Sequence, residues 1–538
     1  MRKVSLFLVI YLISTVCIAQ DTIPVWNKQL INTFMGKNFL KTDKFNNSFV
    51  LVDFYDSLTI GDSTFVNTNK KILSSVLLKY DNNSNLSWMY PMVNKTNIRS
   101  SDLEVDNNGG CYIAGRYFGN FPISSTTTLD STAMWGRSFF VHFKSNGQLD
   151  WAKGFPNASI LLLTTSQNGN IFVKRNMSNG SYQIGDSLFP YTTNETIAKF
   201  DASGKFYWAK TFAPSDGFIA DPFDNIYIYN DFISKITVDT FQLTPKNTKR
   251  AEFFIAKINP MLEVKWVKQI ENGAAFTSTL GSLLLTSDNV GNIYFSSVFR
   301  DSLSLLGNKY YSPQYNKLFF TKIDANGNFI WVKVPVETQP ISEGVGSFKM
   351  ASSNKLKGKI QISSETNFNG HVVTNLNISG AAFIEMDTNG MVSNLSSPIL
   401  SIGSFAPGSG SSYFQLGQIN KNDSIKVQGK YYKAIKKSDL FLVKYDTSHF
   451  SSIEPKNNIL NNVVLFPNPA NAVFYVSSKN EPIIGLQVYN SLGELTYNLT
   501  NLNSNQLQLN AESYPKGIYF VKIKTNSNQF VIKKLVVK

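Results

Sequence analysis

The chain has three histidines, and their spacing does not predict a metal site or a catalytic group. His142 lies in FFVHFKSNGQLDW, His371 follows FNG, and His449 lies in TSHF. Zinc sites use His and Cys ligands at short, characteristic spacings, and these three residues share none. We therefore predict no zinc site and no catalytic histidine.

Other motifs that would carry chemistry are also missing from the sequence. It contains no G-x-S-x-G elbow, no glycine-rich phosphate loop and no EF-hand loop. GSGSS at 408–412 is typical of a flexible turn. Turn carboxylates such as Asp106 and Asp288 have the chemistry for weak calcium binding, but a solvated turn is the simpler interpretation. We predict no catalytic, metal-binding or cofactor-binding residue, and no cofactor.

Acidic pairs keep one enzymatic alternative open. Glycosidases use two carboxylates that meet in space and not in sequence. The chain has 37 acidic residues, so some pairing is inevitable and indicates nothing by itself. A polysaccharide lyase or hydrolase is therefore an alternative to a non-catalytic protein.

An Asp-Ser-hydrophobic pattern recurs along the chain. It resembles the O-glycosylation acceptor motif of exported proteins of the Bacteroidetes. Some copies fall at related points of a longer repeat, so a role in a turn is the alternative explanation for them. The acceptor residues that the resemblance implies are Ser57, Ser187, Ser302 and Ser424.

The first 19 residues predict a secretory signal peptide. Arg2 and Lys3 precede an apolar run from Val4 to Ala19, which is too short to span a bilayer, and cleavage is expected before Gln20. A buried first helix is the alternative. Val16 argues against a lipidated Cys17. No later segment predicts a transmembrane span.

Removal of that peptide leaves one cysteine, Cys111. An intrachain disulfide is then impossible, and Cys111 in the strand-like GGCYIAG is interpreted as a small buried hydrophobe.

A repeat of about 60 residues occupies most of the remaining chain. Each copy has paired apolar residues, Lys, an Asp or Asn turn with Gly, and then Trp, as in TIAKFDASGKFYW. Successive Trp residues from Trp88 onward are 63, 57, 58 and 65 residues apart. Two hairpin-like units per copy give four strands, the size of a propeller blade. The predicted blade-scaffold residues are Trp26, Trp88, Trp151, Trp208, Trp266 and Trp331.

The ends of the repeat region complete each other. Trp26 in VWNKQL lacks the strand that normally precedes it, and DLFLVKYD at 439–446 lacks its Trp. A sixth complete copy is degenerate and places Asn394 at the Trp position. Joining the two terminal pieces into one blade protects the edges of the ring. We predict an all-β chain with a seven-bladed β-propeller over 22–446, closed by pairing of its N- and C-terminal strands.

This repeat resembles the β-propeller repeats of Bacteroidetes surface proteins, written F-x-x-K-x-D-x-x-G-x-x-x-W. It is more distantly similar to the tryptophan-docking repeat of quinoprotein propellers, although no quinone ligand is recognisable. The resemblance implies a fold and leaves the ligand open.

A polar segment, 447–462, predicts a linker before a smaller C-terminal domain over 463–538. FPNPA sets a turn ahead of a strand, and short strands follow to the last residue, which predicts a small Ig-like β-sandwich. An ordinary Ig-like accessory module is one interpretation of this domain.

The motifs of this domain resemble the type A sorting domain of the type IX secretion system. That resemblance implies passage across the outer membrane, with the type IX machinery as partner. The residues that carry it are Phe466, Pro467, Asn468, Pro469, Gly493, Gly517, Tyr519, Lys533 and Lys534.

The export signals, the repeat architecture and the absence of catalytic motifs together favour a binding protein. The net charge of +14 is dispersed and forms no basic stripe, so nucleic acid is not an expected partner. We expect a cell-surface or secreted protein that binds an unknown glycan or protein without catalysis. A secreted polysaccharide enzyme and a structural surface-layer component are the alternatives.

Overall fold

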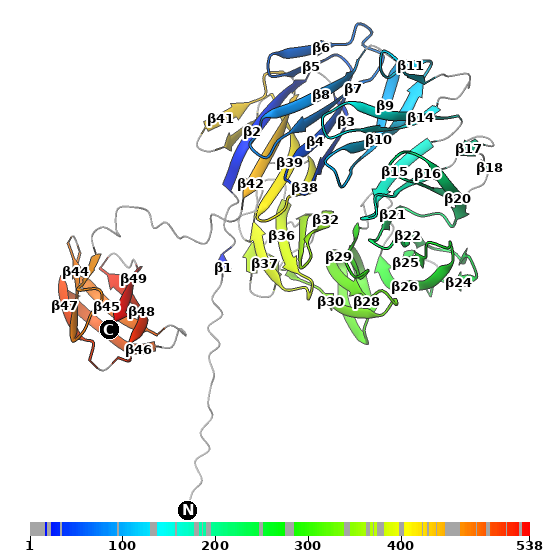
Figure 1. Ribbon diagram of the computed structural model, residues 1–538. Coiled ribbons are helices and arrows are strands. Elements are labelled where there is room, and N and C mark those ends of the chain that lie inside the picture. Colours follow the sequence, from blue (N-terminus) through cyan, green and yellow to red (C-terminus); the bar gives the residue numbers. More distant parts are fainter. Residues whose placement is uncertain are drawn as a thin grey trace, which may run out of the picture. The chain divides into compact units, whose positions relative to one another are not determined.

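The computed structural model (Figure 1) describes residues 17–18, 23–446 and 463–538, apart from short internal gaps. The gaps are 33–34, 94–95, 130–136, 157–158, 177–181, 185–186, 190–194, 247–250, 275–283, 338–344, 362–365, 369–370, 374–380, 397–402, 422, 428–429, 437, 480, 491–494, 513 and 527–529. Of the predicted signal peptide only Cys17–Ile18 (β1) is described, and the predicted linker lies outside the described residues.

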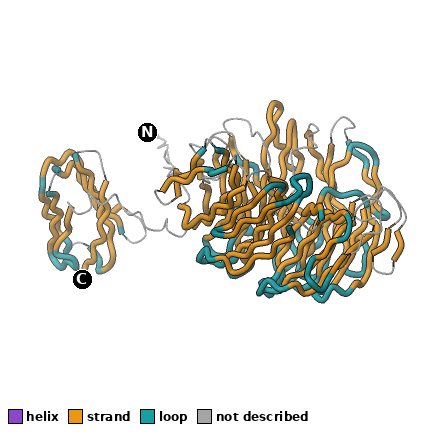
Figure 2. Tube along the Cα trace, turned by 90° about the horizontal axis from the view of Figure 1, so that it is seen from above, coloured by secondary structure: helices purple, strands orange, loops and turns teal. Residues whose placement is uncertain are grey.

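The chain forms two compact units, Met1–Ser448 and His449–Lys538. Figure 2 shows strands and loops in both units, and the described residues contain no helix. The prediction of an all-β chain is therefore confirmed. The described part of the chain has no helical segment long and apolar enough to cross a membrane.

The first unit is built from sets of four antiparallel strands, and the described residues contain seven such sets. Five of them use strands that are close in sequence. They are β3 (Met35–Thr42), β4 (Ser48–Phe54), β7 (Ser74–Tyr80) and β8 (Leu86–Met92); β9 (Asn97–Val105), β10 (Cys111–Phe118), β13 (Arg137–Phe143) and β14 (Leu149–Pro156); β15 (Ser159–Thr165), β16 (Ile171–Asn176), β19 (Glu195–Phe200) and β20 (Phe206–Phe212); β21 (Gly217–Ala220), β22 (Ile226–Phe232), β25 (Ala251–Ile258) and β26 (Val264–Ala274); and β32 (Val345–Ser352), β33 (Lys355–Gln361), β36 (Ala381–Asp387) and β37 (Val392–Ser396).

A sixth set consists of β27 (Leu284–Ser287), β28 (Ile293–Leu305), β29 (Asn308–Ile323) and β30 (Phe329–Lys333). The pairing of Asn272 with Leu303 joins it to the preceding set, so the two form one extended sheet. We name each set by its first strand, for example the β27 set.

The remaining set combines both ends of the unit. β38 (Gly403–Pro407), β39 (Ser412–Asn420) and β42 (Ser438–Asp446) come from its C-terminal end, and β2 (Ile23–Asn32) comes from its N-terminal end. β2 pairs antiparallel with β42 over nearly its whole length, with Gln29 opposite Phe441 and Pro24 opposite Tyr445. The two terminal pieces that the sequence left incomplete thus lie side by side in one sheet (Figure 1).

A small hairpin follows the second strand of most sets. The hairpins are β5 (Ser57–Ile60) with β6 (Ser63–Val66), β11 (Phe121–Pro122) with β12 (Thr128–Leu129), β17 (Tyr182–Ile184) with β18 (Ser187–Phe189), β23 (Ile236–Val238) with β24 (Phe241–Leu243), β34 (Thr366–Phe368) with β35 (His371–Val373), and β40 (Ser424–Val427) with β41 (Lys430–Lys433). β5 also pairs with β2, and β34 pairs with β31 (Val336–Glu337), so these two hairpins tie neighbouring sets together.

Neighbouring sets pack face to face through shared apolar cores. Val50 and Val76 of the β3 set, for example, lie in one buried cluster with Leu416 and Leu442 of the β38 set. The first strands of successive sets are also in contact, and they run in the order β38, β3, β9, β15, β21, β27, β32 and then β38 again. Among the strands that the structure describes, no sheet closes on itself, and contacts between first strands and between sheet faces link the sets.

The tryptophans occupy equivalent places near the start of a fourth strand. Their indole N–H groups donate to a carbonyl in a turn of the next set, over 2.9–3.2 Å. The donor and acceptor pairs are Trp26 with Asn82, Trp88 with Ser145, Trp151 with Ala202, Trp266 with Ala325, and Trp331 with Thr388. Trp208 packs against the core that the β15 and β21 sets share.

Asn394 breaks this series next to the set that combines both ends of the unit. In that set the third strand, β42, and the fourth strand, β2, are not consecutive in the chain. Within the described residues, an indole at 394 would therefore lack the hairpin turn between third and fourth strands on which the other tryptophans lie, which explains the degenerate copy.

The second unit contains two sheets around one core. One sheet has β43 (Val463–Phe466), β44 (Val473–Ser478) and β47 (Gln506–Asn510), and the other has β45 (Ile483–Tyr489), β46 (Leu495–Ser504), β48 (Gly517–Thr525) and β49 (Phe530–Val537). Alternate residues of the strands, such as Phe474, Val488 and Val521, are fully buried between the sheets.

We expect Gly327→Ala to destabilise the first unit more than Gly307→Ala. Both glycines have positive φ, 88° and 74°, so both substitutions carry a backbone cost of about 1–2 kcal/mol. A Cβ at Gly327 would also lie 2.9 Å from the Trp266 ring, whereas a Cβ at Gly307 meets nothing within 4 Å. Crowding should add about 1–2 kcal/mol at Gly327.

Urea denaturation followed by tryptophan fluorescence measures both variants against the unchanged protein. Equal losses of unfolding free energy would show that close contact between the indole and the turn contributes nothing to stability.

Candidate functional site

The first strands of the sets hold one another through polar side chains near the turns that follow them. Thr164 Oγ1 on β15 accepts the Ala220 N–H of β21 at 3.3 Å. Thr286 Oγ1 on β27 accepts the Met350 N–H of β32 at 3.1 Å. Each threonine lies one or two residues before the end of its strand, so these bonds form a layer just below the turns.

Charged residues take these places in three of the sets. Lys41 on β3 forms an ion pair with Glu104 on β9, and their side chains are 19% and 16% exposed. Asp102, two residues before Glu104, is buried and accepts the Leu163 N–H of β15 at 2.7 Å. Lys349 on β32 completes the group, because the charges of Lys41 and Glu104 act strongly on it. We call these four residues the inner charged cluster.

The cluster changes the protonation of its members. Burial would lower the pKa of Lys41, but the carboxylates of Glu104 and Asp102 outweigh it and raise that pKa above its usual value. Lys41 also outweighs burial at Glu104 and keeps the pKa of that carboxyl low. Burial raises the pKa of Asp102 to about 6. The positive charge of Lys41, together with burial, lowers the pKa of Lys349 to about 8.

Side chains from the turns meet at the same end of the first strands. Asn107, in the turn after β9, donates to the Gln167 carbonyl in the turn after β15 at 2.9 Å. The Gln167 amide donates to Asn289 Oδ1, in the turn after β27, at 2.8 Å. This last bond passes over the intervening β21 set. The turns of these sets therefore converge, which places a polar bridge at the turn end of the first strands.

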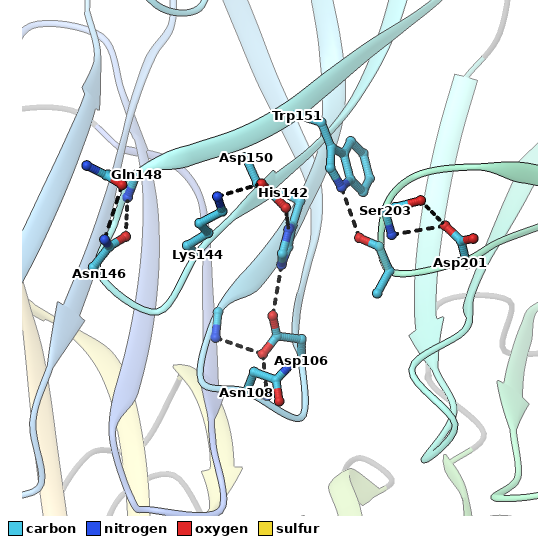
Figure 3. Close-up of polar contacts among 12 residues, drawn as sticks. Asp106, Asn108, His142, Lys144, Asn146, Gln148, Asp150, Trp151, Asp201 and Ser203 are labelled. Atoms are coloured by element: carbon cyan, nitrogen blue, oxygen red, sulfur yellow. Dashed lines mark hydrogen bonds and ion pairs between the residues drawn. The ribbon is translucent and has the colours of Figure 1, made fainter.

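A second polar cluster surrounds His142 (Figure 3). His142 takes the lysine position of the repeat, whereas Lys79 and Lys257 at that position donate to carbonyls in turns of the next set. His142 Nε2 lies 2.8 Å from Asp106 Oδ2, and Nδ1 lies 3.0 Å from Asp150 Oδ2. Both ring nitrogens face carboxylates of the same set, so the imidazole forms a structural contact in place of the repeat lysine.

The Asp106 carboxylate is also a turn acceptor. Its Oδ1 accepts the N–H groups of Asn108 and Gly110. Burial would raise the pKa of Asp106, but the hydrogen bond from His142 and these backbone donors outweigh burial and lower the pKa. Asp288 likewise accepts two backbone N–H groups and the Tyr294 hydroxyl. The turns thus use their carboxylates internally, and the described residues contain no group of three or more metal ligands.

The other candidate residues are dispersed. Cys111 is fully buried, and burial raises the pKa of its thiol. The backbone of His371 lies in β35, far in sequence from His142, and His449 lies outside the described residues.

Ser57, Ser302 and Ser424 share a local setting. Each lies on a hairpin strand beside a buried hydrophobic residue, Leu58, Leu303 or Ile425. Ser57 and Ser302 are half-buried and Ser424 is exposed, while Ser187 begins β18. The hydrophobic residue of the pattern therefore anchors the hairpin, and the serine occupies the alternate face.

The sorting motifs converge in the second unit. Asn468 of FPNPA donates to the Lys534 carbonyl at 2.6 Å and accepts the Val536 N–H at 2.8 Å, which connects the turn to the last strand. Phe466 is exposed and stacks on Tyr475, and the Tyr519 hydroxyl donates to the Pro515 carbonyl. The structure places Pro467 and Pro469 in the same turn, Gly517 at the start of β48 and Lys533 on β49, while Gly493 lies outside the described residues.

Residues 464–538 match the family model of the secretion system C-terminal sorting domain. The chain ends in a sorting domain. The predicted resemblance of this domain to type IX sorting domains is confirmed, and the domain implies a Bacteroidetes setting. The sorting domain implies export to the cell surface or the extracellular space.

The chain is similar to several solved structures, all at low identity. A Dos1 propeller has 10% identity, a TM-score of 0.39, and covers 78% of this chain and 95% of its own. A protein of unknown function from Bacteroides caccae has 9% identity, a TM-score of 0.28, and coverages of 53% and 80%. An apocarotenoid oxygenase from Synechocystis has 12% identity, a TM-score of 0.33, and coverages of 78% and 94%. No curated protein matches the chain.

Sequence reasoning did not find the inner charged cluster. Its members are far apart in sequence and lie outside the repeat motif. One sequence feature does point to the cluster. Lys41 lies two residues before the turn residue Asp43, and Glu104 lies two residues before the turn residue Asp106. Other sets have neutral residues at this place, such as Thr164, Thr286 and Ile219, so charges there are exceptional.

We expect His142→Ala to lower the free energy of unfolding by about 1–3 kcal/mol at pH 7, because it leaves the carboxylates of Asp106 and Asp150 without their shared partner. His142→Lys should retain most of the stability, because it restores the residue of the repeat. Chemical denaturation compares the three proteins.

The pH dependence provides the control. A carboxyl with a lowered pKa in the folded state stabilises only while it is ionised. The stability difference between the unchanged protein and Asp106→Asn should be present above about pH 4 and disappear as the pH falls through the lowered pKa. A difference that persists at lower pH would contradict the ionic contact.

Proposed function

We propose that the first unit is a seven-bladed β-propeller closed between β2 and β42, with residues 1–19 as signal peptide, 22–446 as propeller, 447–462 as linker and 463–538 as an Ig-like sorting domain. Support comes from the seven four-stranded sets, the contacts between successive first strands, and the β2–β42 register. The six tryptophans are proposed as scaffold residues, because five of them donate to the turn of the next set.

The proposed closure predicts the effect of removing β2. A chain that starts at Met35 lacks β2 and keeps β3 whole, and it leaves β42 as an exposed edge strand, which favours association. Compared with a chain that starts at Gln20, we expect a lower unfolding temperature and a shift toward oligomers. Thermal denaturation and size-exclusion chromatography measure both, and an equally stable monomer would contradict closure through β2.

We propose that the mature protein is a non-catalytic binding protein on the cell surface or outside the cell, delivered by its sorting domain. The observation that carries this proposal is the inner charged cluster, where side chains of the β3, β9 and β32 sets meet. Groups from several blades that converge near the propeller axis suit recognition of one glycan or protein group.

An enzyme acting on polysaccharide is the second candidate. Asp102 and Glu104 have pKa values that their environments move in opposite directions, as in an acid and base pair. Two contacts argue against this role: Asp102 accepts the Leu163 N–H, and Glu104 pairs with Lys41. Both carboxylates are therefore engaged between sets. A structural surface-layer component remains the third candidate if the propeller binds nothing.

The proposed O-glycosylation of Ser57, Ser187, Ser302 and Ser424 rests on their motif and on the hairpin positions of three of them. The proposed sorting residues are supported by the contacts that Asn468 makes with the last strand.

A glycan array probed with the mature protein tests the binding proposal. We expect a ligand that the unchanged protein binds and that the Lys41→Met/Glu104→Gln variant binds at least about tenfold more weakly, because the variant replaces the ion pair with neutral side chains of similar size. Circular dichroism verifies the variant's fold. Equal binding by both proteins would contradict the site, and cleavage of the glycan that Asp102→Asn abolishes would establish the enzyme instead.

A further inference from the structure

Two arginines lie opposite each other on neighbouring strands of the β9 set. Arg99 on β9 pairs with Arg116 on β10 in the antiparallel register. Opposed residues of an antiparallel pair point to the same face of the sheet, with Cβ atoms about 4.5–5.5 Å apart. Like charges at such places destabilise a sheet. The two arginines therefore carry an energetic cost that the packing of the strands does not explain.

Neither guanidinium is compensated within the described part of the chain. Both arginines are exposed, and neither forms a hydrogen bond or an ion pair there. Partial burial and then the positive charge of Arg99 lower the pKa of Arg116. The carboxylate of Asp102, also on β9, accepts the N–H groups of Leu163 and Leu103 instead. The donors of both guanidinium groups are thus available to a bound molecule.

A second pair of opposed cations shows how the fold compensates such a contact. Lys357 on β33 lies opposite Lys349 on β32. The Lys357 side chain is fully buried, and its ammonium donates to three carbonyls of the turn at 408–412 in the next set. Among the described residues, the arginine pair has no such acceptors, so its compensation has to come from outside the chain.

A β-bulge lies next to the arginine pair. The register shifts just before Gly115 and leaves Ser101 as an extra residue on β9. At Gly115 the strands approach so closely that a Cβ would lie 2.7 Å from the Arg99 carbonyl oxygen and 2.6 Å from the Phe139 ring. Bulges re-aim the side chains beside them and are frequent next to functional sites. The bulge thus sets the direction in which the two arginines leave the sheet.

An exposed aromatic ring continues the same face of the sheet. Phe118 follows Arg116 by two residues on β10 and is 44% exposed. Side chains at i and i+2 of a strand lie on one face, so the ring and the guanidinium are neighbours. An anionic group on a ring with an apolar face, as in an acidic sugar, fits this combination.

The choice of arginine over lysine points to the same ligand chemistry. The chain has 51 Lys and Arg residues, and only seven of them are Arg. A guanidinium group presents a planar fork of donors that binds a carboxylate or a tetrahedral oxyanion through two hydrogen bonds, whereas an ammonium group acts as a point charge. Two of the few arginines meet at one place in this sheet.

We propose that Arg99 and Arg116 form an anion-binding site for a carboxylate or sulfate ester of an acidic saccharide, with Phe118 beside the sugar ring. A bound oxyanion lies between the two like charges and replaces their repulsion with attraction. The net charge of +14 favours the approach of such a ligand. Arg99 lies five residues before Glu104 on β9, so this site is separate from the inner charged cluster and does not rest on its proposed role.

Calorimetric titration at low ionic strength tests the site with defined probes. The mature protein is titrated with a chondroitin sulfate oligosaccharide, oligogalacturonate, free sulfate and acetate, and with a malto-oligosaccharide as the uncharged probe. We expect saturable binding of at least one acidic oligosaccharide and none of the uncharged one. Added salt should weaken the binding, because the site is exposed and its charges are screened.

Variants assign the binding to the arginine pair. Arg99→Gln and Arg116→Gln should each weaken it at least about tenfold, as expected for the loss of charged hydrogen bonds. Replacement of both arginines by Lys keeps the charges, loses the forks and should give intermediate affinity. Arg300→Gln is the matched control, because Arg300 is an exposed arginine on β28 without an arginine opposite it. Phe118→Ala should weaken binding of the oligosaccharide and leave binding of free sulfate unchanged.

Thermal denaturation without ligand gives a second readout. Because the two charges repel each other, Arg116→Gln should unfold at the same temperature as the unchanged protein or at a higher one at low salt. A lower unfolding temperature would assign the arginine to the stability of the sheet and overturn the proposal.

The binding outcomes also separate this site from the inner charged cluster. Absence of saturable binding by every acidic probe overturns the arginine site, and so does binding that neither Gln variant weakens. Lys41→Met/Glu104→Gln should bind the acidic probes like the unchanged protein, and loss of their binding would assign the anion to the inner charged cluster instead. Sulfate binding as tight as that of the oligosaccharides, and unaffected by Phe118→Ala, supports the arginine pair and identifies a free anion as its ligand.

Discussion

The contact between a tryptophan of one sheet and a turn of the next is the constraint on which the rest of the first unit depends. The indole N–H donates to a carbonyl of that turn, and the ring lies against its glycine, where a Cβ would come within 2.6–3.2 Å of an indole atom at Gly147, Gly204, Gly327 and Gly390. Each of these glycines also has positive φ. Each of these turns therefore needs Gly both for its positive φ and for the close approach of the indole ring. Repetition of the contact sets the angle and spacing between neighbouring sheets.

The same contact explains the irregular places of the repeat. Asn394 replaces Trp next to the set whose third and fourth strands, β42 and β2, are not consecutive in the chain. His142 replaces Lys in the β9 set, and two carboxylates of that set compensate for the change. The repeat thus changes its Trp or Lys where the group that this side chain would contact is different. The pairing of β2 with β42 builds a sheet whose third and fourth strands come from opposite ends of the unit and are not joined by a hairpin.

Near the ends of the first strands, most sets have neutral side chains and three sets have charged ones. Thr164 and Thr286 link neighbouring strands through neutral hydrogen bonds, and the cluster of Lys41, Glu104 and Lys349 introduces charge into the same layer. Charged groups this close to a protein interior are stabilised by their charge partners. Loss of any one member therefore leaves another charge without a partner and destabilises the cluster. That sensitivity is why the cluster is a better candidate for recognition than the His142 group, whose donors and acceptors are matched within one sheet.

The amino-acid sequence alone determined the all-β class, the repeat with its tryptophans, the complementary terminal strands and the sorting domain, because each is written in local patterns: alternation, turn residues and spacing. Tertiary structure alone decided which side chains meet. Lys41, Glu104 and Lys349 are separated by 63 and 245 residues, and none belongs to the repeat motif. Their interaction exists only because different sheets bring their first strands together, and Coulomb energy depends on distance in space and not on distance along the chain.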